Sequence, residues 1–389
     1  MARLGDVCDI LNGFAFKSEQ YVDRGIRIIR IANVQKGFIE DSTPVFYPFD
    51  SKDAKKYSLE EGDMLMSLTG NVGRVAKLSK EFLPAALNQR VACLRIKDGV
   101  ALDKAFLFNL LNSDYFEQQC IAASKGVAQK NMSTEWLKEY EIPMFPIEQQ
   151  KAIASLLDKV SELIALRKEQ LTKLDQLVKS RFIELFGDML LNEMEWDESP
   201  LESLADVVSG ITKGRKVRET DLVEVPYMAV SNVKDGYIDW TTVKTIMATK
   251  QEIEQYRLLP YDVLMTEGGD PDKLGRGAVI VAPLENSIHQ NHIFRVRLQT
   301  EKILPVFFSE YLQHQKAKRY FLRSAKQTTG IASINMKQLR ALPVLVPPLE
   351  LQEQFVTFVE QTDKSKLAIQ QSLDKLELLK KALMQEYFG

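Results

Sequence analysis

The segment PIEQQKAIASLLDKV, residues 146–160, returns near the end of the chain as PLELQEQFVTFVEQT, residues 348–362. In both places a proline is followed by an acidic residue and then by a long stretch that lacks Pro and Gly, which is typical of a helix start. Both stretches end on a Phe-Gly pair, in ELFG at 184–187 and in EYFG at 386–389. The sequence therefore predicts two long helices of almost equal length, over 147–187 and 348–389.

The two helices belong to a longer internal repeat that covers almost the whole chain. Several matched pairs follow one another in the same order: LGDVCDILNG (4–13) with LADVVSGITKG (204–214), RIANVQKGFI (30–39) with AVSNVKDGYI (229–238), NVGRVA (71–76) with KLGRGAV (273–279), and NQRVACLRI (88–96) with QNHIFRVRL (290–298). A repeat of this length is stronger evidence about architecture than any short motif.

Each half has the same internal plan. Its front part mixes short β-type runs with turns and one helical stretch, at 104–123 and 305–325, and its back part is the long helix. We expect an α+β fold in which two similar mixed α/β domains are separated by two long antiparallel coiled-coil helices, related by a pseudo-twofold internal repeat. The expected boundaries are a first domain at 1–146, a first helix at 147–187, a linker at 188–200, a second domain at 201–347 and a second helix at 348–389.

The long helices carry a heptad seam, because steps of four and three residues visit mostly apolar side chains. The helix-pairing positions are Ile153, Leu157, Val160, Ile164, Leu171, Leu174 and Val178 in the first helix, and Phe355, Val359, Ile369, Leu373, Leu376 and Leu383 in the second. Two unrelated surface helices, or a homodimer seam in each, would give the same pattern. We favour pairing within one chain, and the short linker favours an antiparallel arrangement that brings Gly389 near the N-terminus.

Composition places few limits on function. Hydrophobic residues make up 45% and charged residues 27% of the chain, as in ordinary globular proteins, and the net charge of −2 carries no overall signature of nucleic-acid binding. No apolar run reaches the length of a membrane span, and the start MARLGDVCDI does not resemble a signal peptide. Three cysteines, Cys8, Cys93 and Cys120, show no disulfide or zinc spacing, so we expect a reducing, cytoplasmic setting.

Two modules joined by a rigid spacer suit duplex DNA with two half-sites, and the polar loops carry the residue types that read bases or hold phosphates. The candidate DNA-binding residues are Thr69, Asn71, Arg74, Asn88, Gln89, Arg90, Lys125, Gln129 and Lys130 in the first half, and Lys213, Arg215, Lys216, Glu267, Asp270, Lys273, Arg276, His289, Gln290, Asn291 and Lys326 in the second. Each of them alone is equally compatible with a solvated loop side chain.

Motifs for catalysis or metal binding are not found. The chain has no GxxxxGK[ST] phosphate loop, no Asn/Asp-Pro-Pro-aromatic tetrapeptide of amino-methyltransferases and no Ser-His-Asp constellation. The acidic stretch GGDPDK (268–273) lacks the spacing of a calcium loop, and HQNH (289–292) lacks a third metal ligand. We therefore predict no catalytic residue, no metal site and no cofactor of its own.

The Pro-[IL]-Glu-x-Gln entry to a long helix, occurring twice, together with the two LGD-like openings, resembles the specificity (S) subunit of type I restriction–modification systems. That resemblance covers essentially the whole chain. It implies a non-catalytic subunit with two target-recognition domains, each reading one half of an asymmetric bipartite double-stranded DNA site, with helices that set the spacer. It also implies two modification subunits and motor-nuclease subunits as partners, which would carry S-adenosylmethionine, ATP and magnesium.

Two other classes of function compete with this interpretation. A stand-alone DNA methyltransferase would need a catalytic motif, and a coiled-coil scaffold would have loops that are indifferent to nucleic acid. Salt-dependent binding to duplex DNA would exclude the scaffold, and methylation by the isolated chain would indicate the enzyme.

Overall fold

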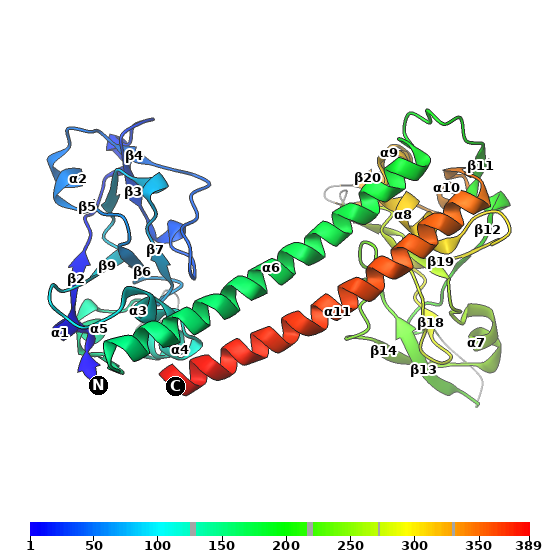
Figure 1. The fold of residues 1–389 in the computed structure, drawn as a ribbon. Helices are drawn as coiled ribbons and strands as arrows, with labels where there is room; N and C mark the ends of the chain where they lie inside the picture. The colour runs from blue at the N-terminus through cyan, green and yellow to red at the C-terminus, as the bar shows by residue number, and fades with distance from the viewer. Residues whose placement is uncertain (125–129, 216–220, 271–272, 329–330) are drawn as a thin grey trace. The chain divides into compact units, whose positions relative to one another are not determined.

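The computed structural model describes residues 1–389 apart from 125–129, 216–220, 271–272 and 329–330 (Figure 1). It forms two compact units, one made of Met1–Glu169 with Gln370–Gly389 and the other of Gln170–Ile369. Each unit contains one globular domain and the ends of both long helices, α6 (Ile147–Phe186) and α11 (Leu349–Phe388). The units therefore divide within the helices, whereas the domain boundaries predicted from the sequence lie where the helices begin.

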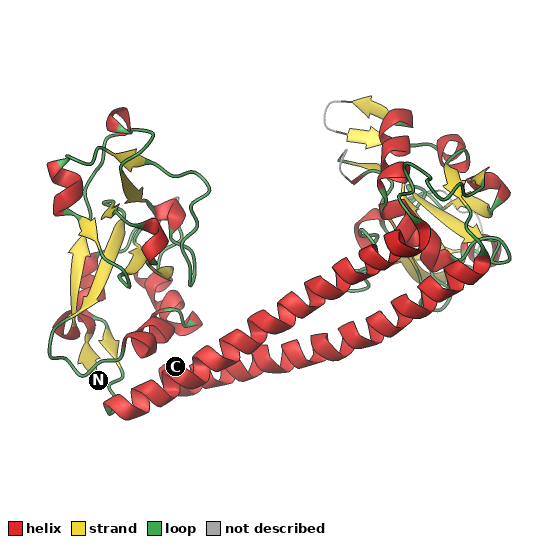
Figure 2. Cartoon of the chain, turned by 45° about the horizontal axis from the view of Figure 1, so that its top comes forward, coloured by secondary structure: helices red, strands yellow, loops and turns green. Residues whose placement is uncertain are grey.

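The first domain is built on two four-stranded sheets, with the orders β2-β9-β6-β7 and β4-β3-β8-β5. A short pair, β1-β10, joins its two ends. Figure 2 draws the strands as yellow arrows. The strands are β1 (Ala2–Arg3), β2 (Cys8–Asn12), β3 (Ile26–Ile29), β4 (Phe46–Tyr47), β5 (Ser58–Leu59), β6 (Met64–Ser67), β7 (Val75–Lys77), β8 (Ala85–Leu87), β9 (Val91–Ile96) and β10 (Glu141–Ile142). The helices are α1 (Leu4–Val7), α2 (Lys52–Lys56), α3 (Lys104–Leu111), α4 (Asp114–Ala123) and α5 (Thr134–Glu139).

The second domain repeats this plan. Its main sheet has the order β12-β19-β15-β17, and a second sheet, β14-β13-β18, again contains one parallel pair. Its strands are β11 (Glu198–Pro200), β12 (Ala205–Ser209), β13 (Val223–Met228), β14 (Lys244–Ala248), β15 (Val263–Thr266), β16 (Gly268–Gly269), β17 (Gly277–Val279), β18 (Ile288–His289), β19 (Ile293–Leu298), β20 (Lys326–Thr328), β21 (Ile331–Ser333) and β22 (Pro343–Leu345). Its helices are α7 (Lys250–Tyr256), α8 (Pro305–Gln313), α9 (Gln315–Ser324) and α10 (Met336–Arg340).

The best-matched residues of the repeat have structural roles. Asn33 and Asn232 are buried, and each Oδ1 accepts the backbone N–H three residues earlier at 2.9 Å while Nδ2 donates to a carbonyl. Gly37 and Gly236 follow with φ of 92° and 81°, a conformation that favours glycine. The matched asparagine and glycine therefore shape a turn.

Each predicted helical stretch before the long helix is in fact two helices. Ser113 ends the first stretch early, because its hydroxyl accepts from the Phe116 N–H and caps α4. In the second domain the break falls at His314, whose backbone is extended.

The glutamine shared by the two helix-entry motifs is a clamp. Gln150 is fully buried; its Oε1 accepts the Asp103 N–H at 2.9 Å, and its Nε2 donates to the carbonyls of Ala101 and Phe145. Gln352 makes the same three bonds in the second domain, to the Leu304 N–H and to the carbonyls of Lys302 and Pro347. In each domain a buried glutamine thus joins the first turn of the long helix to the residue that precedes α3 or α8.

The two long helices run antiparallel to each other within each unit. Lys168 pairs with Glu377 at 2.8 Å in the first unit, and Asp175 pairs with Lys366 at 2.7 Å in the second. All the predicted helix-pairing positions are buried or half-buried: Ile153, Leu157, Val160, Ile164, Leu171, Leu174, Val178, Phe355, Val359, Ile369, Leu373, Leu376 and Leu383. This burial agrees with the predicted seam, whose end positions also belong to the domain cores.

The phenylalanine that closes each long helix enters a domain core. Phe388 lies 5.3 Å from Phe106 of α3 between ring centroids, and Phe186 lies 4.8 Å from Phe307 of α8. Both rings are almost fully buried. Each domain core is therefore completed by the last turn of a helix that begins in the other unit.

Within the described residues, no helix combines the length and apolar character that crossing a membrane requires.

Candidate nucleic-acid interface

Three chain segments of the first domain meet at one end of its main sheet. The loop after β6 is tied to the turn between β8 and β9 by a bond from the Leu68 N–H to the Arg90 carbonyl, 3.0 Å long. The same loop is tied to the segment before α5, because the Gly70 N–H donates to the Lys130 carbonyl at 2.9 Å. The structure thus gathers predicted residues that lie far apart in the sequence: Asn71, Arg74, Asn88, Gln89, Arg90 and Lys130.

The second domain builds the same cluster with different side chains. The Glu267 N–H donates to the His292 carbonyl at 3.0 Å, and the Ile334 N–H donates to the Glu267 carbonyl at 2.8 Å. Strand β16 then pairs with β21 of the hairpin that begins at Lys326. Glu267, Asp270, Lys273, Arg276, Gln290, Asn291 and Lys326 are therefore carried by the loops of this cluster or by the hairpin joined to it.

The loop glycines allow the first of these loops to lie close against the helices. Gly73 and Gly275 have φ of 85° and 72°, and a Cβ atom on Gly73 would meet the Cβ of Cys120 at 2.8 Å. Arg74, the next residue, donates from Nη1 to Gln35 Oε1. The cluster is thus held by backbone contacts, which leaves the side chains of Asn71, Gln89 and Arg90 exposed.

Two predictions of DNA contact are wrong, because the side chains of His289 and Thr69 are buried, and a third predicted residue, Arg215, has its guanidinium group bound within the fold. His289 is fully buried: it occupies the position of Leu87 in the first domain, its ring Nδ1 bonds the Ile293 carbonyl at 3.1 Å, and burial lowers its pKa to about 4. Thr69 is also buried, in an isolated bridge with Asn131. Arg215 is bound by Glu252 through both carboxylate oxygens, each at 2.5 Å, a hydrogen bond that lowers the pKa of Glu252 and fixes the start of α7.

The remaining predictions have mixed placements. Lys213 is exposed and lies on the loop after β12, two residues before Arg215. Asp270 and Lys273 form an ion pair with each other. Lys125, Gln129 and Lys216 lie outside the described residues.

One residue of this interface was overlooked in the sequence. His292 is the last residue of HQNH and stands where the first domain has Arg90. Its side chain is 57% exposed, and its Nδ1 lies 2.5 Å from Glu267 Oε2. The internal repeat gives the signal, since the equivalent residue of the first domain, Arg90, is a predicted DNA-binding residue.

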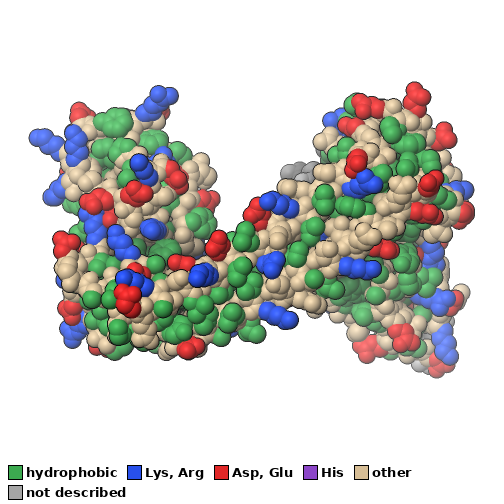
Figure 3. All heavy atoms as spheres, in the orientation of Figure 1, with side chains coloured by type: hydrophobic (Ala, Val, Ile, Leu, Met, Phe, Trp, Pro, Cys, Tyr) green, Lys and Arg blue, Asp and Glu red, His purple; other side chains and the backbone are tan. Residues whose placement is uncertain are grey.

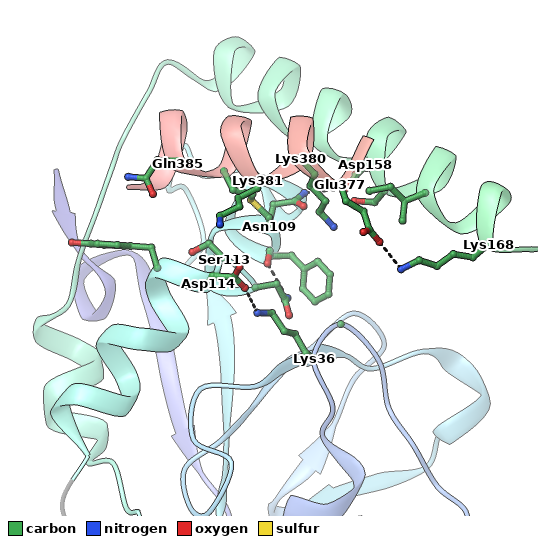
Figure 4. A pocket seen from close by; sticks show the side chains of 17 residues that line it. Lys36, Asn109, Ser113, Asp114, Asp158, Lys168, Glu377, Lys380, Lys381 and Gln385 are labelled. Carbon is green, nitrogen blue, oxygen red and sulfur yellow. Dashed lines mark hydrogen bonds and ion pairs between the residues drawn. The ribbon is translucent and has the colours of Figure 1, made fainter. Parts of the chain in front are cut away.

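A hollow of about 710 Å³ lies in the first unit, between the domain and the long helices (Figure 4). Lys36 reaches into it from the turn at Gly37 and pairs with Asp114 and Glu117, both at 2.7 Å. Lys380 of α11 faces it, and burial together with neighbouring lysines lowers the pKa of its ammonium group.

A hollow of about 760 Å³ occupies the corresponding place in the second unit. It is lined by equivalent positions, among them Gly236 for Gly37, Gln313 for Asn112 and Phe182 for Met384. Its charge differs, because Glu310 stands where the first hollow has Asn109, and burial raises the pKa of that carboxyl group.

The long helices also expose large apolar side chains (Figure 3). These are Leu156, Leu163, Leu166, Leu177 and Ile183 of α6, and Leu367, Leu378 and Leu379 of α11. None of them belongs to the predicted seam. We take these exposed side chains as candidates for sites of protein association.

Comparison with known proteins gives a consistent result. The family model "Type I restriction modification DNA specificity domain" matches residues 1–176 and 193–379. The EcoKI specificity subunit of Escherichia coli K12 is 23% identical over 93% of this chain and 81% of its own length. The StySPI specificity subunit of Salmonella potsdam is 24% identical over 100% of this chain and 88% of its own length.

Solved structures show the same fold. A type I restriction–modification S subunit from M. genitalium aligns with a TM-score of 0.60, at 18% identity, over 100% of this chain and 95% of its own. A second chain, from a study of the assembly of a type I restriction–modification system, aligns with a TM-score of 0.62 over 100% and 96% of the two chains.

Proposed function

Because the chain belongs to the family of type I restriction modification DNA specificity domains, we propose that it is the sequence-recognition subunit of a type I restriction–modification complex. Each domain reads one half of an asymmetric, bipartite site in double-stranded DNA. The long helices fix the distance between the two half-sites and bind the modification subunits.

One observation supports this proposal more than any other. The two domains present loops on the same backbone framework but with different polar side chains, Asn88-Gln89-Arg90 in the first and Gln290-Asn291-His292 in the second. Asn and Gln pair with adenine and Arg pairs with guanine in the major groove. Equal frameworks with unequal side chains are what two different half-sites require.

The exposed residues divide into base-reading and phosphate-holding groups. Gln89 and Arg90 stand on a tight turn held by the strand ends, so they are suited to base edges. Lys130 and Lys326 are exposed on neighbouring segments and suit phosphates, which carry no sequence information.

The helix surfaces support docking of two modification subunits. The two hollows are lined by equivalent positions, and exposed leucines lie on the helices in both units: Leu163 in the first and Leu367 in the second. A hollow that occurs at equivalent positions in both units suits two copies of one partner. We infer that the chemistry resides on those partners, which bind S-adenosylmethionine, and on the motor-nuclease subunits, which use ATP and magnesium.

Mapping of methylated sites tests the recognition role. The chain is co-expressed with its modification subunits, and methylated adenines are located by sequencing. We expect one bipartite motif with an unspecified spacer, and an Arg90→Ala change that relaxes one base of one half-site only. Altered bases in both half-sites would contradict the assignment of one half-site to each domain.

Native mass spectrometry tests the docking. Leu163→Lys or Leu367→Lys should reduce the complex from two modification subunits to one, and both changes together should abolish binding. Leu191→Lys is a matched control, since Leu191 is 65% exposed but lies outside the helices. Two bound subunits in the double variant would refute this docking surface.

A further inference from the structure

Glu267 and His292 form a polar chain on the second domain with Asn291. His292 Nδ1 lies 2.5 Å from Glu267 Oε2, and the other ring nitrogen, Nε2, lies 3.3 Å from Asn291 Nδ2. The amide nitrogen can only donate, so Nε2 accepts and the ring proton is on Nδ1, where it donates to the carboxylate. One ring thus fixes the direction of the Glu267 side chain.

The backbone of Glu267 is fixed as well. Its N–H donates to the His292 carbonyl and its carbonyl accepts from the Ile334 N–H. Gly268 and Gly269 follow, and a Cβ on Gly268 would meet the Ala332 carbonyl oxygen at 2.9 Å. The carboxylate therefore stands on a rigid support beside two residues without side chains, which lets another molecule approach closely.

DNA phosphates repel the carboxylate, so a position facing DNA requires a favourable interaction that offsets this repulsion. Its second oxygen, Oε1, has no hydrogen-bond partner among the described residues, whereas Oε2 has His292. A carboxylate oxygen can only accept, and the only donors on the major-groove edge of bases are the amino groups of cytosine N4 and adenine N6. The first domain has buried Leu68 at this position, so the feature belongs to the second half-site alone.

We propose that Glu267, oriented by His292, is the acceptor for the exocyclic amino group of one base in the second half-site. Cytosine fits best, since its major-groove edge offers a donor and no acceptor beside it. His292 is a positioning residue that holds the carboxylate through its Nδ1 proton. This inference rests on the proposed DNA-recognition function.

The test uses the complete complex with its modification subunits and methylation of a duplex library randomised in the second half-site. Glu267→Gln should reduce the preference for the amino-bearing base at one position by about 5- to 150-fold and leave the first half-site unchanged. Glu301→Gln is the matched control: it removes the same charge, is exposed, and lies beyond the far end of β19.

Two further measurements separate the roles. His292→Asn keeps a donor near the Nδ1 position and should retain the base preference, whereas His292→Gln places its amide near Nε2 and should lose it. A duplex in which cytosine is replaced by a 2-pyrimidinone nucleotide, or adenine by purine, lacks the amino group; only the replacement at the base that is read should weaken wild-type binding. That replacement should not weaken binding by Glu267→Ala further.

The results distinguish this inference from the function beneath it. If wild-type methylation is sequence-specific but Glu267→Gln keeps every base preference, the inference is overturned while DNA recognition stands. If wild-type methylation shows no sequence preference, the proposed function itself fails.

Discussion

Replacing Gln150 by alanine should destabilise the first unit far more than the loss of a polar side chain from a polar stretch of sequence suggests. The side chain is fully buried and makes three hydrogen bonds, to one N–H and two carbonyls. Each bond contributes about 1 kcal/mol, and unpaired buried groups cost about 1–3 kcal/mol each. We expect a loss of about 3–5 kcal/mol in the free energy of unfolding.

The assay is thermal and urea unfolding of the full chain, followed by a probe in the first domain. A loss of this size lowers Tm by roughly 6–20 °C for a unit of about 150–250 residues. Gln149→Ala is the control, because the neighbouring glutamine is exposed and its change should cost less than about 0.5 kcal/mol.

A charge-bearing variant sharpens the result. Gln150→Glu keeps the size but replaces two donors by an acceptor that faces the Ala101 and Phe145 carbonyls, so it should be at least as destabilising as alanine. Equal stability of Gln150→Ala and Gln149→Ala would show that the three hydrogen bonds of Gln150 do not stabilise the first unit.

Three other predictions follow from the structure. Burial lowers the pKa of His289 to about 4 in the folded protein, from its ordinary value of 6.5, so the unfolded state binds the proton first as the pH falls. The free energy of unfolding should therefore fall by up to about 3 kcal/mol between pH 6.5 and pH 4. In urea titrations, His289→Leu should remove this dependence on pH. An insertion of four residues near Leu171, with a matching insertion near Leu373, adds about 6 Å to each helix. The spacer in the methylated DNA site should lengthen by about one or two base pairs, while the half-sites stay unchanged. An unchanged spacer would mean that the helices do not set its length. Residues 1–195 should form a symmetric dimer in which Phe186 of each copy takes the place of Phe388, seen as twice the monomer mass in light scattering; a folded monomer at high concentration would contradict this.

The repeat made the architecture predictable, because periodicity and matched segments depend on sequence alone. It predicted two mixed domains, two long helices and their seam, and it placed Asn88, Gln89 and Arg90 in a loop of the recognition domain. The long-range partners were not predictable. The sequence near Arg215 does not predict its pairing with Glu252. The motif HQNH does not predict that its first histidine ends a buried strand while its last histidine is exposed.

The buried glutamines show a second limit. Gln150 and Gln352 are polar residues in a polar stretch, which indicates an exposed helix turn, yet both are fully buried. Their partners are backbone groups near residues 101–103 and 302–304, and such partners leave no trace in side-chain patterns. The sequence identified the motif but not its mechanical role.

The division of the chain into units has a consequence for biosynthesis. The second unit is one continuous stretch, Gln170–Ile369, whereas the first unit needs Gln370–Gly389, which are synthesised after the whole of the second unit. Domains usually fold in the order of their synthesis. Here the domain that is made first acquires Phe388, the last large residue of its core, only after the second unit has been synthesised. The N-terminal half must therefore wait, with that core position open, until the C-terminal half has been made.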